Sequence, residues 1–174
     1  QLTPASYISF LVLYRYYDRR YQALFGNAFS QGSTVQNEQG VYMGLQLTPI
    51  ARWKLSIYAD LFRFPWLKYG IDAPSGGQEY MAQIDYTPSR NYSAYLRYKY
   101  RQKEKNRTFE NDNLLRINSY KQHRIRFQQV YNFSSPFIFK TSLDGILFDD
   151  PIKKLNKGIM ISQSIGWKPT TLPL

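Results

Sequence analysis

The chain has 174 residues, 17% of them aromatic, and its 23 lysines and arginines against 12 aspartates and glutamates give a formal net charge of +11. That length suits a single domain, and so many aromatic residues favour sheets, barrels and interfaces over helical bundles. The absence of cysteine excludes disulfides and thiolate metal sites, and a single histidine makes a serine–histidine triad hard to build. The positive charge indicates either an anionic partner or surroundings, or simply basic loops.

Eight segments alternate apolar and polar residues with a period of two, the pattern of a β-strand with two different faces. We expect strands at 6–17, 37–47, 53–61, 78–86, 92–102, 115–133, 137–147 and 158–167. Short turns marked by Pro4, Pro49, Pro88, Pro136 and Pro169 alternate with long polar loops at 18–36, 63–77, 103–113 and 149–157. The sequence therefore predicts an antiparallel up-and-down meander in one domain, residues 1–174.

The segment 92–102 shows the alternation most clearly. Leu96, Tyr98 and Tyr100 alternate with cations at 97, 99 and 101. Such a strand suits a soluble sheet with its charges in water, or a membrane barrel with its charges in a wet lumen. The two alternatives are a transmembrane β-barrel and a soluble β-barrel or sandwich that binds an anionic ligand or nucleic acid.

Three features favour the membrane barrel. The expected strands are about as long as a tilted membrane crossing requires. Long loops at one end and short turns at the other match the extracellular and periplasmic ends of outer-membrane barrels. Aromatic residues near the strand ends, such as Trp53, Tyr86, Tyr92, Tyr100 and Trp167, suit two interfacial belts. We expect an all-β, antiparallel up-and-down transmembrane β-barrel of about eight strands in the bacterial outer membrane, with long loops extracellular and short Pro-marked turns periplasmic.

The alternation assigns side chains to two faces. The expected lumen-facing polar residues are Lys54, Asp60, Glu79, Asp85, Arg97, Lys99, Arg124, Arg126, Lys140 and Asp144. The expected lipid-facing residues are Leu55, Ile57, Ile84, Leu96, Tyr98, Ile125, Phe127, Phe139 and Ile161. Because the polar set contains both signs of charge, we expect ion pairs between neighbouring strands.

Several stretches also carry a family resemblance. They are Asn37-Glu38, 40–45 (GVYMGL), 58–67 (YADLFRFPWL), Pro74-Ser75-Gly76 and Leu96-Arg97-Tyr98. Together they resemble the barrel region of a Bacteroidota family of outer-membrane proteins known mainly for a helix-hairpin-helix segment that precedes the barrel. The likeness covers most of the chain, and 60–66 (DLFRFPW) is its most specific part. It implies a location and a fold, with no catalytic residues to transfer. The helix-hairpin-helix segment is not within these residues.

We expect these residues to be one section of a larger barrel. A lumen that holds so many long charged and tyrosine side chains suits more than eight strands. The segment 170–174 also reads like the start of another strand, and the first four residues lack the features of a signal peptide. The expected partners are outer-membrane lipid and lipopolysaccharide, further barrel strands or other outer-membrane proteins, in a structural, transport-related or complex-forming role.

Candidate chemistry is sparse, and we expect no enzyme, cofactor or metal site. His123 has Ser119 four residues away and Ser142 on the opposite face, so no nucleophile is positioned beside it. Asp60 with Glu79 or Asp85 suits charge pairing with lumen cations better than acid–base catalysis.

A nucleic-acid partner is not expected either. Tyrosines and cations interleave in 95–101, as in some single-strand binders, but Tyr98 and Tyr100 face away from Arg97 and Lys99. Bases and phosphates of one strand would then lie on opposite sides of the sheet.

Overall fold

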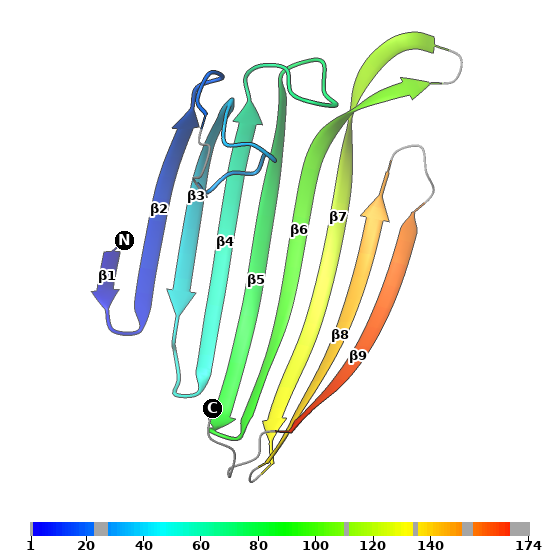
Figure 1. The fold of residues 1–174 in the computed structure, drawn as a ribbon. Helices are drawn as coiled ribbons and strands as arrows, with labels where there is room; N and C mark the ends of the chain where they lie inside the picture. The colour runs from blue at the N-terminus through cyan, green and yellow to red at the C-terminus, as the bar shows by residue number, and fades with distance from the viewer. Residues whose placement is uncertain (1, 23–27, 110–111, 134–135, 151–154, 168–174) are drawn as a thin grey trace.

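The computed structural model describes residues 2–22, 28–109, 112–133, 136–150 and 155–167. These residues form one antiparallel sheet in which the strands follow one another in chain order (Figure 1). The strands are β1 (Leu2–Ala5), β2 (Ile8–Tyr17), β3 (Glu38–Leu47), β4 (Trp53–Phe64), β5 (Ser75–Ser89), β6 (Tyr92–Phe109), β7 (Asp112–Asn132), β8 (Phe137–Asp149) and β9 (Asn156–Trp167). The predicted all-β, up-and-down meander is confirmed. The described ranges contain no helix long and apolar enough to cross a membrane.

The sheet is open within the described residues. There, β9 pairs with β8, and β1 pairs with β2, but the two edges of the sheet do not pair with each other. Figure 1 shows the loops from β2 to β3 and from β4 to β5 at one end of the strands, and the turns from β1 to β2, from β3 to β4 and from β5 to β6 at the other. The two ends of the sheet therefore differ: one, the loop end, carries these loops, and the other, the turn end, carries the short turns.

One predicted loop was wrong in its boundaries. The segment 103–113 is largely strand, because the β6–β7 ladder continues through Lys103 opposite Tyr120 to Arg107 opposite Arg116. Backbone hydrogen bonds hold this hairpin together, so it does not need the apolar alternation that ends near Gln102. Residues 110 and 111 of that predicted loop lie outside the described residues.

Two predicted turns are also strand. β1 occupies the region of Pro4, and β5 continues through Pro88 to Ser89, so that its turn comprises only Arg90 and Asn91. The pairing of β5 with β6 shifts register between Tyr86 and Ser89, an irregularity of the kind that accommodates a proline at a strand end. The turn predicted at Pro169 and the strand start predicted at 170–174 lie outside the described residues.

The register divides the side chains into two faces. Tyr42, Asp60, Glu79, Arg101 and Gln122 stand opposite one another on successive strands from β3 to β7. This face, which we call the charged face, contains all ten polar residues that the sequence analysis assigned to one side. All nine residues assigned to the other side, from Leu55 to Ile161, share the opposite face, which we call the apolar face.

Burial on this sheet differs from that of a soluble domain, although the apolar side chains of Phe62, Phe64 and Ile71 are also buried at the loop end. Among the described residues the buried charged side chains include Arg15, Glu38, Asp60, Glu79 and Asp144. The apolar face is exposed along its length, with Leu96 at 45%, Ile125 at 50% and Ile161 at 70%. A soluble domain normally buries its large apolar side chains and keeps unpaired charges in water.

Candidate functional site

The most buried part of the charged face is an ion cluster centred on Arg15 of β2. Its Nε donates to Glu38 Oε1 at 2.6 Å, and its Nη1 donates to Asp60 Oδ1 at 2.7 Å. The exposed fractions are 3% for Arg15 and 0% for both carboxylates. Gly40 makes room for this arrangement, because a Cβ there would lie 2.7 Å from Arg15 Cζ. The guanidinium thus lies across a strand that lacks a side chain at the point of crossing.

Residues 28–37 fold over this cluster, and we call them the inward loop. Ser30 Oγ donates to Glu38 Oε2 at 2.6 Å, the backbone N–H of Gln31 donates to the same carboxylate, and Gln31 Nε2 donates to Asp60 Oδ2 at 2.8 Å. In Figure 1 the connection between β2 and β3 crosses in front of β3 and β4. The two carboxylates therefore hold a loop against the face of the sheet.

The inward loop is also tied to the loop between β4 and β5. Asn37, which has a left-handed backbone with φ of 53°, donates from Nδ2 to the carbonyl of Trp66 at 2.8 Å and accepts the Trp66 N–H at 2.9 Å. Asparagine tolerates this conformation better than most residues. The two long loops thus form one connected structure at the loop end of the sheet.

A second cluster surrounds Glu79 of β5. Lys99 Nζ lies 2.8 Å from Glu79 Oε1, Arg101 Nε donates to Oε2 at 2.5 Å, and the Tyr58 hydroxyl donates to Oε1 at 2.5 Å. Glu79 is 3% exposed. The carboxylate of Glu79 therefore accepts hydrogen bonds from two cations and a phenol.

A third cluster surrounds Asp144 of β8. Arg126 Nε donates to Asp144 Oδ1 at 2.7 Å, and Arg124 donates to the same oxygen at 3.1 Å. The register of β6 and β7 places like charges side by side, because Lys99 stands opposite Arg124 and Arg97 stands opposite Arg126. Glu79 on β5 compensates two cations of β6, and Asp144 on β8 compensates two cations of β7.

The remaining predicted polar residues lie nearer the turn end. Lys54 Nζ is 3.8 Å from Asp85 Oδ2, a longer pair whose lysine is exposed, and Arg97 Nε donates to the amide oxygen of Gln83 at 2.6 Å. Lys140 stands opposite Val130 and Ser164, away from the three clusters. The expected mixed-charge pairing is thus present on the charged face, although not at every residue named.

The apolar face carries aromatic pairs at two levels. Near the turn end, Trp53 and Tyr86 have ring centroids 4.4 Å apart, and Tyr92 lies 6.3 Å from Tyr131. Nearer the loops, the Tyr100 ring lies 6.1 Å from Tyr80 and 5.0 Å from His123. Between the two levels the exposed side chains are mainly aliphatic.

His123 belongs to the aromatic level nearer the loops. The Tyr98 hydroxyl lies 2.8 Å from its Nδ1, and its ring contacts Tyr100. The Ser142 hydroxyl is on the charged face, 2.6 Å from that of Ser162. Asp60 and Glu79 stand opposite each other, but each is held by cations. His123 is therefore part of a hydrogen-bonded aromatic pair, and the two carboxylates are parts of ion pairs. In the described part of the chain, these residues form no arrangement of nucleophile and base.

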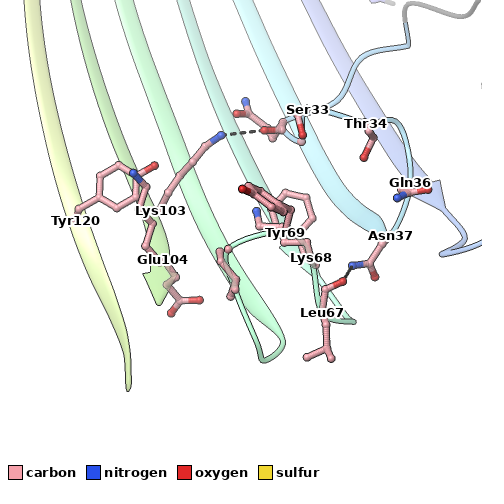
Figure 2. Close-up of a pocket in the computed structure, with 16 residues that line it drawn as sticks. Ser33, Thr34, Gln36, Asn37, Leu67, Lys68, Tyr69, Lys103, Glu104 and Tyr120 are labelled. Atoms are coloured by element: carbon pink, nitrogen blue, oxygen red, sulfur yellow. Dashed lines mark hydrogen bonds between the residues drawn. The ribbon is translucent and has the colours of Figure 1, made fainter. Parts of the chain in front are cut away.

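A hollow of about 710 Å³ opens at the loop end of the charged face (Figure 2). Figure 2 shows Lys103 reaching across it toward the inward loop, where its Nζ donates to the carbonyl of Gln31 at 2.9 Å. Lys68 Nζ lies 3.3 Å from the centre of the Phe64 ring, and Lys105 Nζ lies 4.9 Å from the centre of the Tyr120 ring. No group of three or more potential metal-binding side chains occurs among the residues that the structure describes.

Sequence reasoning missed Arg15, the inward loop and this hollow. Arg15 follows three apolar or small residues on its face of the strand, so its only signal was a lone cation at the end of an apolar run. The inward loop was expected only as a long polar loop, because its contacts with Glu38 and Asp60 depend on the folded sheet.

Comparison of the chain with family models, with characterised proteins and with solved structures found no match in any of the three. The resemblance to the Bacteroidota barrel family therefore stays a prediction.

Proposed function

We propose that this sheet is part of the wall of a bacterial outer-membrane β-barrel, with the apolar face toward lipid and the charged face toward a polar lumen narrowed by the inward loop. The main support for the proposal is that charged side chains are buried while apolar side chains are exposed. The side chains of Arg15, Glu38, Asp60 and Glu79 are at most 3% exposed, whereas those of Leu96, Ile125 and Ile161 are exposed. An exposed apolar face of this extent in a soluble monomer would promote association.

The spacing of the aromatic levels supports a single membrane crossing. From Tyr92 to Tyr100 the chain takes eight steps of about 3.3 Å, or about 26 Å along the strand. At a tilt of about 40°, the height is about 20 Å, comparable with the apolar band of about 25 Å in outer-membrane barrels. The long loops would then be extracellular and the short turns periplasmic.

The open sheet supports completion of the barrel by further strands. Both edges of the described sheet, β1 and β9, leave backbone groups without a strand partner on their outer side. Since a sheet in lipid must satisfy these groups by closing, we propose that additional strands of the same protein or of another outer-membrane protein pair with them. The role is structural, transport-related or complex-forming, and the proposal assigns no catalytic residue.

A soluble sheet that binds an anionic ligand is the second candidate. It is favoured by the excess of cations on β6 and β7. There Lys99 and Arg101 share the carboxylate of Glu79, Arg124 and Arg126 share that of Asp144, and Arg97 donates instead to the amide of Gln83. It would require another layer to cover the apolar face.

Membrane fractionation tests the proposal. The full-length protein is expressed in a Gram-negative host, and the envelope is washed at high salt and then at alkaline pH before detergent extraction. We expect the protein to stay in the outer-membrane fraction through both washes and to be released by detergent. Recovery as a folded protein without detergent at neutral pH would overturn the membrane assignment.

A further inference from the structure

The hollow at the loop end has more positive charge than its neighbours compensate. Its lining includes Lys68, Lys103 and Lys105 and the carboxylate of Glu104. Glu104 Oε2 already accepts the backbone N–H of Gly76 at 2.6 Å. The three ammonium groups contact three aromatic rings and one backbone carbonyl, since Lys103 Nζ also lies 5.3 Å from the centre of the Phe62 ring.

The pKa of Lys103 is lowered both by burial and by neighbouring cations. Lys103 lies three residues beyond Tyr100, outside the apolar band, and the charged groups that act on it electrostatically are Arg101, Lys68, Glu79 and Glu38. Burial, together with Arg101 and Lys68, lowers the pKa of Lys103 to about 8. Burial also lowers the pKa of Lys68 in the loop between β4 and β5. A negatively charged group in the hollow would relieve both penalties.

The remaining lining supplies neutral groups that suit an oxyanion. Thr34 and Gln36 of the inward loop border the hollow, as does Tyr120 of β7, and Figure 2 shows them around its opening. The cations that line it are all lysines. A lysine ammonium binds phosphate as a point charge, with three donors that can rotate toward its oxygens.

We propose that the hollow bounded by Lys68, Lys103 and Lys105 is a binding site for a phosphate ester group. The phosphate belongs to a soluble sugar phosphate or to the phosphorylated headgroup of a lipid, since both present the same dianion. The site consists of loop-end residues, so it does not depend on whether the apolar face meets lipid.

Calorimetric titration of the full-length protein in mild detergent tests this inference. The probes are glucose 6-phosphate, glucose, and micelles with or without monophosphoryl lipid A, all at pH 7. We expect glucose 6-phosphate to bind and glucose not to bind. If micelles with monophosphoryl lipid A bind more tightly than glucose 6-phosphate, the ligand is a phosphorylated lipid headgroup. If they bind equally or more weakly, the ligand is a soluble sugar phosphate.

Variants locate the site. Lys103→Gln and Lys68→Gln are each expected to weaken phosphate binding at least about ten-fold, because each removes one charge-assisted contact. Lys54→Gln is the matched control, since Lys54 is a lysine on the same face at the opposite end of the sheet. Circular dichroism and heat-modified gel mobility report folding of each variant. Absence of phosphate binding by the folded wild-type protein, or equal loss in the control, would overturn the proposal.

The pH dependence gives an independent readout. Phosphate esters are dianionic above about pH 7, so their own titration contributes little at higher pH. A bound dianion raises the pKa of Lys103, so binding takes up a proton once the pH exceeds about 8. We expect affinity to fall by up to about ten-fold per pH unit above pH 8 in the wild type, and by less in Lys103→Gln. The same pH dependence in both proteins would contradict a role for Lys103.

Discussion

Arg15 is the residue on which the charged face depends most. It compensates two carboxylates, Glu38 and Asp60, that are both fully buried. Arg15→Ala leaves these charges without their cation, and we expect the free energy of unfolding to fall by about 3–5 kcal/mol. Urea titration in detergent or lipid vesicles measures the change.

Arg63→Ala is the matched control for this substitution. Arg63 also makes two hydrogen bonds, both to Gln39 Oε1, but it is exposed. We expect the free energy of unfolding to change by less than about 1 kcal/mol. Equal effects of the two substitutions on the free energy of unfolding would show that burial of the Arg15 cluster does not contribute to its importance for stability.

Gly77 is a second sensitive residue, because the Phe62 ring lies against its backbone. A Cβ at Gly77 would lie 2.5 Å from Phe62 Cζ and 2.6 Å from the carbonyl oxygen of Gln102. We expect Gly77→Ala to destabilise the protein by about 1–3 kcal/mol through overpacking, measured in the same urea titration. At Gly166 the nearest atom would be 3.7 Å away, so Gly166→Ala is expected to be neutral or slightly stabilising.

At the scale of elements, the inward loop depends on the Glu38 carboxylate. Ser30 Oγ and the backbone N–H groups of Gln31 and Gly32 all donate to it. We expect Glu38→Ala to speed chymotrypsin cleavage after Phe29 about ten-fold or more, because loss of these charge-assisted hydrogen bonds favours opening of the loop. Gln39→Ala, a substitution next in sequence but on the other face, should leave the rate near that of the wild type.

The strands could be predicted from the sequence more completely than their connections. Alternation such as that of Leu96 and Arg97 depends only on neighbours in the chain, so both faces followed from it. The β6–β7 hairpin beyond Gln102 has no alternation to show where it ends. The contacts of Arg15 and the inward loop join residues up to 72 positions apart, and no local pattern specifies them.

At the scale of the whole molecule, the two faces of the sheet require different surroundings. On the charged face, buried charges are compensated by ion pairs within the face itself, in the clusters at Arg15, Glu79 and Asp144. The apolar face has nothing in the described residues to cover it. A lipid environment on one side and a narrow polar lumen on the other meets both requirements.

Leu96 and Arg97 test this account most directly, because they are adjacent and project to opposite faces. Leu96 lies midway between Tyr92 and Tyr100, so Leu96→Arg would place a charge near the bilayer midplane at a cost of about 2–4 kcal/mol. Arg97→Leu removes a hydrogen bond to Gln83 and should cost about 0.5–1.5 kcal/mol.

The measurement is the free energy of unfolding of both variants in lipid vesicles. The account predicts that Leu96→Arg destabilises the protein clearly more than Arg97→Leu does. Equal tolerance of the two substitutions, or a larger effect of Arg97→Leu, would contradict the assignment of the apolar face to lipid.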